Sequence, residues 1–155
     1  SRGNVETLFV TLLIGVLNVE TGALELVNAG HDAPWRIGAS GEPGQLHVSA
    51  DAGGPPLGVI DNFAYPVQRF QLSPGDRLCM VTDGITEAAN HVGDLYGGAR
   101  LHAVLKNLDQ QHSTQSIVHA LRQDVETFVA GAEASDDMAI LVLQWRGRQA
   151  AVNRP

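Results

Sequence analysis

An apolar run followed directly by an acidic cluster occupies residues 77–88, with the sequence Arg77-Leu78-Cys79-Met80-Val81-Thr82-Asp83-Gly84-Ile85-Thr86-Glu87-Ala88. A second acidic cluster, Ser135-Asp136-Asp137, stands directly before the apolar run at 138–143. Both apolar runs predict strands. A carboxylate at the end of a buried strand is fixed by the sheet and open to solvent at the rim. Two such carboxylates repel each other unless a cation lies between them.

The chemistry of these clusters favours a hard cation. Carboxylate oxygens are the ligands that Mg²⁺ and Mn²⁺ prefer, whereas zinc and copper prefer nitrogen and sulfur. The two clusters together therefore predict a metal site that activates water. Each cluster alone is weaker evidence, since Asp-Gly is common in turns and an aspartate before a strand often caps a loop. Roughly three of four such clusters taken singly are structural.

Composition indicates one folded domain. The chain has 155 residues, of which 44% are apolar and 17% charged, so a packed core is expected and global disorder is not. The net charge of −7 argues against nucleic acid as the main partner, although such a charge also serves solubility alone. We find no leader-like segment and no apolar run long enough to span a bilayer, so we expect a cytoplasmic protein without a membrane partner.

Cys79 is the only cysteine of the chain. No intrachain disulfide and no cysteine-rich metal site can therefore form. Because Cys79 lies within an apolar strand, we expect a buried, inert thiol rather than a nucleophile.

The order of predicted elements is typical of an α+β domain. Residues 8–19 are almost continuously apolar, which predicts a strand covered on both faces. The remaining strands are expected at 23–29, 35–37, 45–48, 65–72, 77–82 and 138–145. Helices are expected at 99–108 and between Ser113, as the N-cap, and Gly131, as the terminator. These elements predict two stacked, mostly antiparallel sheets, with a domain over residues 1–146 and a disordered tail over 147–155.

Several motifs in the same order match a known family. They are Phe9-Val10-Thr11-Leu12, Asn28-Ala29-Gly30-His31, Gly53-Gly54-Pro55-Pro56-Leu57-Gly58, Leu72-Ser73-Pro74-Gly75-Asp76, Thr82-Asp83-Gly84-Ile85-Thr86-Glu87-Ala88 and Asp136-Asp137-Met138. The chain resembles the SpoIIE-like (RsbU-type) branch of the 2C-type, metal-dependent protein serine/threonine phosphatases (PPM superfamily). The resemblance runs from about Thr7 to Trp145, and several motifs in register make it specific.

The resemblance implies a four-layer α-β-β-α sandwich that holds two Mn²⁺ or Mg²⁺ ions between the sheet edges. It implies that Asp83 and Asp136 are metal ligands, and that Asp137 has a supporting or structural role. Gly84 and Glu87 belong to the same motif and are expected to support or line the site. His31 stands where eukaryotic relatives usually carry an aspartate that contacts a further metal. We therefore expect His31 to line the site, or, as an equal alternative, only to bond backbone.

One departure from the family pattern concerns the first residues of the chain. The family has an earlier aspartate, which bridges the two metals, and a Gly-His/Lys-Gly turn, whereas residues 1–7 contain neither. We expect the chain to represent the C-terminal part of a catalytic domain and to be inactive alone. Missing edge strands would leave unpaired backbone groups, so we also expect self-association through exposed edges.

Two functions follow as hypotheses. The first is a phosphatase in bacterial signalling that dephosphorylates a regulatory protein, such as an anti-sigma factor antagonist. The second is a non-catalytic module that binds such a partner without turnover. A third interpretation, in which the acidic clusters are only turns and caps, is disfavoured by the ordered motifs.

Overall fold

The computed structural model describes residues 8–38, 42–46, 53–108, 112–132 and 136–148. Within these ranges the strands are β1 (Leu12–Leu17), β2 (Ala23–Ala29), β3 (Trp35–Ile37), β4 (Gly44–Gln45), β5 (Gln68–Gln71), β6 (Arg77–Val81) and β7 (Ile140–Gln144). The helices are α1 (Asp83–Thr86), α2 (Gly97–Asn107) and α3 (Thr114–Val129). Most of the predicted tail, from residue 149 on, lies outside the described residues.

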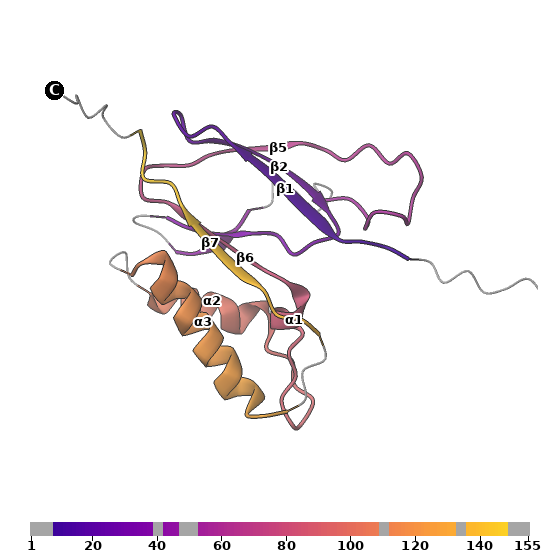
Figure 1. Cartoon of the computed structure of the whole chain (residues 1–155), viewed down its shortest axis with the longest axis vertical. Helices are drawn as coiled ribbons and strands as arrows, with labels where there is room; N and C mark the ends of the chain where they lie inside the picture. Colours follow the sequence, from indigo (N-terminus) through magenta and orange to yellow (C-terminus); the bar gives the residue numbers. More distant parts are fainter. Residues whose placement is uncertain (1–7, 39–41, 47–52, 109–111, 133–135, 149–155) are drawn as a thin grey trace, which may run out of the picture.

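Two antiparallel sheets stack face to face (Figure 1). The first has the strand order β1-β2-β5, and the second has the order β4-β3-β6-β7. Helices α2 and α3 lie against the outer face of the second sheet (Figure 1). The predicted α+β class with mostly antiparallel sheets is confirmed.

Strand β6 separates two apolar cores because its alternate side chains point to opposite faces. Leu78 belongs to the core between the two sheets, whereas Cys79 and Val81 belong to the core under the helices. The strand is therefore buried on both faces, which explains why its sequence is a continuous apolar run. This burial fixes the position of the chain where the first acidic cluster begins.

Helix α3 begins and ends where the sequence predicts. The Ser113 hydroxyl accepts a hydrogen bond from the Ser116 amide, 3.1 Å away, which caps the first turn. After Val129, Ala130 and Gly131 both take positive φ values, of 50° and 82°, and stop the helix. The predicted helix between Ser113 and Gly131 is confirmed.

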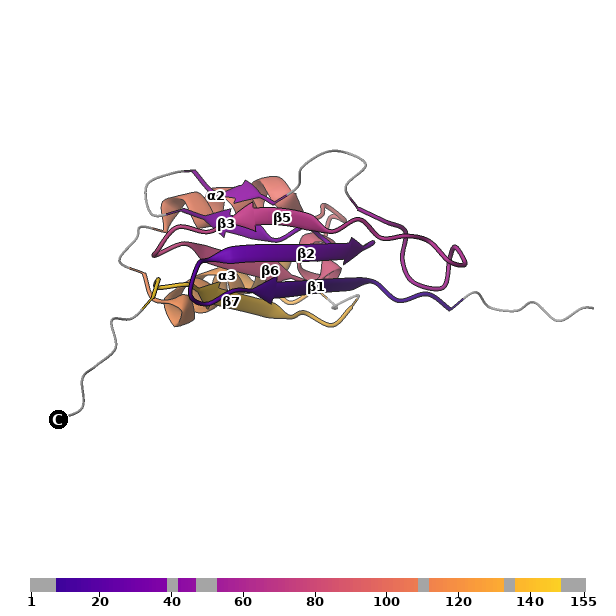
Figure 2. The ribbon, with the colours of Figure 1, turned by 90° about the horizontal axis from the view of Figure 1, so that it is seen from above.

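The prediction for residues 8–19 is wrong in one respect. The observed strand is the shorter β1, and it is not covered on both faces. The side chains of Leu12, Ile14 and Val16 are 37%, 50% and 64% exposed. β1 is an edge strand, and no described element lies over the outer face of its sheet (Figure 2). The described residues thus form three of the four expected layers, with helices on one side only. None of the described helices is long and apolar enough to cross a membrane.

Candidate metal centre

The first acidic cluster follows β6 as a single helical turn, α1, which the sequence analysis did not predict. Thr82 is extended, with ψ of 160°, and Asp83 starts the turn. Ile85, only 1% exposed, anchors the turn in the core beneath. Asp83 itself is exposed at the rim, as expected of a carboxylate at the end of a buried strand, and its Oδ1 accepts a hydrogen bond of 3.0 Å from the Gly84 amide.

The second acidic cluster meets the first through Thr82. The Thr82 hydroxyl donates to the carbonyl of Asp137 over 3.1 Å, across 55 residues of sequence. It also accepts from the amide of Ala139 at 2.9 Å, and the Thr82 amide donates to the Ala139 carbonyl at 3.1 Å. A Cβ on Gly84 would overlap the Asp137 carbonyl oxygen, so the two segments are in direct contact. The structure therefore brings the two predicted clusters together.

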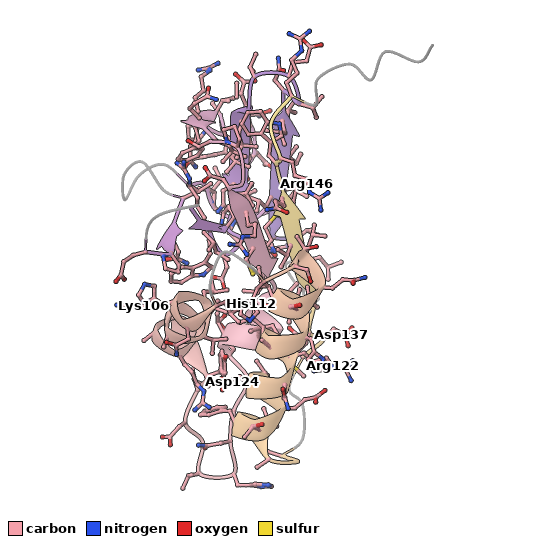
Figure 3. All side chains as sticks on the ribbon, turned by 90° about the vertical axis from the view of Figure 1, so that its left-hand side faces the viewer. Lys106, His112, Arg122, Asp124, Asp137 and Arg146 are labelled. Atoms are coloured by element: carbon pink, nitrogen blue, oxygen red, sulfur yellow. The ribbon has the colours of Figure 1, made fainter. Side chains whose placement is uncertain are left out.

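A pocket of about 310 Å³ opens beside α1. Its lining comes from three segments that are distant in sequence, and consists of Thr11, Gly30, His31, Asp32, Thr82, Asp83 and Glu87. Of the predicted site residues, Asp83, Glu87 and His31 thus share one pocket. Asp136 and Asp137 lie next to Gly84 outside this lining, and Asp137 is at the surface of the molecule (Figure 3).

The loop that carries His31 is held by its own side chains. Asn28 accepts from the His31 amide and donates to the His31 carbonyl, both over 2.8 Å. The Nδ1 of His31 lies 2.9 Å from the carbonyl oxygen of Asp32, which can only accept, so Nδ1 carries the proton. His31 both lines the pocket and bonds backbone, so the two geometries expected for it occur together.

Asp32 is a pocket residue that the sequence analysis missed. The Thr86 hydroxyl donates to the Oδ2 of Asp32 over 2.9 Å, across 54 residues of sequence. In the sequence, Asp32 is part of a Gly-His-Asp-Ala-Pro break between strands, which reads as an ordinary turn. Its proximity to α1 arises only when β3 pairs with β6 in the second sheet, and no local pattern in the sequence reports this pairing.

The residues that line the pocket carry the type of ligand atom that an oxygen-preferring cation requires. The residues that line it include Asp32, Asp83 and Glu87, which carry carboxylates, and Thr11 and Thr82, which carry hydroxyls. Hard oxygen ligands of this kind suit Mg²⁺ or Mn²⁺. Among the described residues, however, no group of three or more His, Cys, Asp or Glu side chains is placed to hold a metal ion. The described part of the chain thus contains ligands of a suitable type but not a complete set of coordinating side chains.

This arrangement of sheets and helices is that of the PP2C phosphatase domains. The phosphatase domain of the cell fate determinant SpoIIE from Bacillus subtilis, presoaked with Mn, superposes with a TM-score of 0.68 at 20% identity, over 90% of this chain and 58% of that one. The RsbU and RsbW domains of a Mycobacterium tuberculosis protein give a TM-score of 0.64 at 21% identity, over 90% of this chain and 37% of theirs. At these identities the likeness establishes the fold.

Sequence comparison establishes the family. The family described as Stage II sporulation protein E (SpoIIE) matches residues 1–146, and the chain belongs to this family. Protein IcfG from Synechocystis is 26% identical over 137 residues, which are 88% of this chain and 20% of that protein. The chain thus spans about a fifth of this curated relative.

Proposed function

We propose that this chain is the metal-binding C-terminal part of a PP2C-type phosphatase domain, which removes phosphate from serine or threonine of a regulatory protein. The observation that carries the proposal is the contact between the two acidic segments, made by Thr82 and Gly84 with Asp137, beside a pocket lined by carboxylates. Membership of the SpoIIE family and the PP2C fold support the same assignment.

Asp83 and Asp136 are the proposed metal ligands, and the complete domain would hold two Mn²⁺ or Mg²⁺ ions. Each of these aspartates uses Oδ1 to accept from the next backbone amide, Gly84 at 3.0 Å and Asp137 at 2.7 Å. The other carboxylate oxygen of each aspartate therefore stays available to a cation. The hydrogen bond from the backbone amide fixes the direction of the carboxylate. A bound metal pair supplies an activated water and neutralises charge on the phosphoryl oxygens.

The other predicted site residues have supporting roles in this proposal. Gly84 allows the Asp137 backbone to approach α1, and Glu87 and His31 line the wall of the pocket. Asp137 contributes its carbonyl to the contact with Thr82. No side chain is required as a nucleophile, which agrees with the complete burial of Cys79.

The proposed substrate is a phosphorylated regulatory protein of the anti-sigma antagonist kind, met in the bacterial cytoplasm. The support is the fold shared with the RsbU and RsbW domain structure and with SpoIIE. A protein substrate also suits the pocket, because Asp83 and Glu87 of its lining are exposed at the surface.

The test compares the full-length protein with its Asp83→Asn variant. Mn²⁺-dependent hydrolysis of p-nitrophenyl phosphate and of a phosphoserine peptide is expected to fall to the background rate in the variant. Asp61→Asn, at an exposed carboxylate outside the pocket, is the matched control and should keep wild-type activity. Undiminished hydrolysis by Asp83→Asn would contradict the assignment.

A non-catalytic module that binds a partner remains the second candidate. The observation that favours it is the absence of a complete metal-binding group among the described residues. Capture of a phosphorylated partner by the full-length protein, without release of phosphate when Mn²⁺ is present, would support this candidate.

A further inference from the structure

The hydroxyl of Thr82 does not do what a threonine at its position normally does. Thr82 is the N-cap residue of α1, where a threonine side chain usually accepts from an amide inside the helix. Here no such cap bond forms. Instead, the hydroxyl donates to the Asp137 carbonyl at 3.1 Å and accepts from the Ala139 amide at 2.9 Å. The hydrogen of the hydroxyl and one of its two lone pairs are thus both used on the segment that carries the second acidic cluster.

Thr86 makes a similar contact at the other end of α1. Its hydroxyl lies 2.9 Å from the Oδ2 of Asp32 and 3.4 Å from the carbonyl of Asp83. A hydroxyl has one hydrogen, and the shorter contact to a charged acceptor is the stronger bond. Thr86 therefore ties α1 to the loop between β2 and β3, which also lines the pocket.

A helix as short as α1 depends on such outside contacts. A single turn has little stability of its own, because helix nucleation fixes several residues for few hydrogen bonds. Ile85 anchors the turn in the core, and Gly84 packs against the Asp137 backbone. The two threonine hydroxyls, one before and one within the turn, add hydrogen bonds that hold the turn to the segments on either side of it.

We propose that Thr82 and Thr86 are positioning residues of the metal centre. Their hydroxyls hold Asp83 at a fixed distance from Asp136 on one side and from Asp32 on the other. This inference rests on the proposed function, since it assigns roles toward the cation that Asp83 and Asp136 would bind. Outer contacts that orient metal ligands typically change metal affinity by about 10–100-fold when they are removed.

The test is a calorimetric Mn²⁺ titration of the full-length protein and its variants. Thr82→Val and Thr86→Val keep the shape of the side chain and lose the hydroxyl, so each is expected to bind Mn²⁺ about 10–100-fold more weakly. Thr82→Ser and Thr86→Ser keep the hydroxyl and should bind close to wild type. Thr127→Val removes a hydroxyl that bonds only the Gln123 carbonyl on α3, and serves as the control. Wild-type affinity in both folded valine variants overturns the proposal.

Hydrogen exchange at the Ala139 amide is a second test. It depends neither on the folding of the variants nor on the proposed function. The Ala139 amide, which donates to the Thr82 hydroxyl, should be protected from hydrogen exchange in the wild type and more protected with Mn²⁺. Free exchange at Ala139 overturns the role of Thr82 even if Thr82→Val does not fold. If the wild type takes up no Mn²⁺, the proposed metal centre fails, and the protection of Ala139 alone then decides whether the Thr82 contact exists.

Discussion

Gly84 and Asp137 are packed so closely that a Cβ on Gly84 would overlap the carbonyl oxygen of Asp137. The backbone of Gly84 takes no positive φ, so the glycine is required here by space and not by conformation. The same glycine donates its amide to the Oδ1 of Asp83. One residue without a side chain therefore lets the two acidic segments touch and orients the carboxylate of the first.

Gly84→Ala is expected to destabilise the protein by about 1–3 kcal/mol, the usual cost of forcing extra volume into a filled site. The added methyl group must push the 136–139 segment away from α1, so Mn²⁺ affinity should fall as well. Chemical denaturation and calorimetry measure the two effects. Gly44→Ala is the control, because a Cβ there meets nothing within 4 Å. A loss of stability no larger than that of the control would show that the contact is not tight.

Asp124 should make stability depend on pH. Arg100 donates to both carboxylate oxygens, at 2.8 and 3.1 Å, and Tyr96 donates to Oδ2 at 2.8 Å. The hydrogen bonds from Arg100, and then that from Tyr96, hold the pKa of Asp124 below its ordinary value of 3.8, against an opposing effect of burial. Because the pKa is lower in the folded than in the unfolded state, the stabilisation is present above about pH 4 and is lost as pH falls toward the folded pKa.

The measurement is the free energy of unfolding of the wild type and of Asp124→Asn at neutral pH and at pH 3. The wild type should be the more stable at neutral pH, and the difference should shrink at pH 3. Arg122→Gln, which removes an exposed ion pair with Glu126 one turn along α3, is the control and should change stability little. A difference between wild type and Asp124→Asn that stays constant with pH contradicts the prediction.

The outer face of the β1-β2-β5 sheet should drive self-association of this chain. Ile14 and Val16 are half or more exposed on a strand at the sheet edge, and contiguous exposed apolar surface of this kind favours association. Sedimentation at increasing concentration should reveal oligomers, which Ile14→Lys combined with Val16→Glu should reduce. Val92→Lys changes a more exposed apolar residue outside this sheet and should leave the oligomers unchanged. A compact monomer at high concentration would refute the prediction.

Cys79 should not react with thiol reagents in the folded protein. The thiol is fully buried, and burial raises the pKa of Cys79 to about 12. At pH 8 a thiol reagent should therefore label it only after denaturant is added. Rapid labelling of the native protein would mean that β6 opens readily, and would also weaken the case for a rigid position of Asp83.

The sequence predicted those elements whose signals are local. Strand β2 has the predicted bounds, and Ser113 and Gly131 delimit α3, because caps and alternation act over a few residues. The burial of β1 could not be predicted from such local signals. An apolar run shows that a strand can be covered, but what covers it depends on elements elsewhere.

The candidate site was predictable in part. Asp83, Glu87 and His31 share the pocket, and their motifs had singled them out. Asp32 could not be predicted, because its contact with Thr86 spans 54 residues and produces no pattern in the sequence around either residue. The contacts of the Thr82 and Thr86 hydroxyls could not be predicted for the same reason. Whether Asp83 and Asp136 bind metal stays a prediction.

The contact between Thr82 and Asp137 also has a consequence for the order of folding. Both helices α2 and α3 lie in the sequence between these two residues, so the contact closes a long loop and must await the docking of β7. During synthesis, a growing chain that ends within α3 carries Asp83 without its counterpart. If Asp83 and Asp136 bind Mn²⁺ as proposed, a ribosome-bound chain stalled before residue 136 should not take up Mn²⁺.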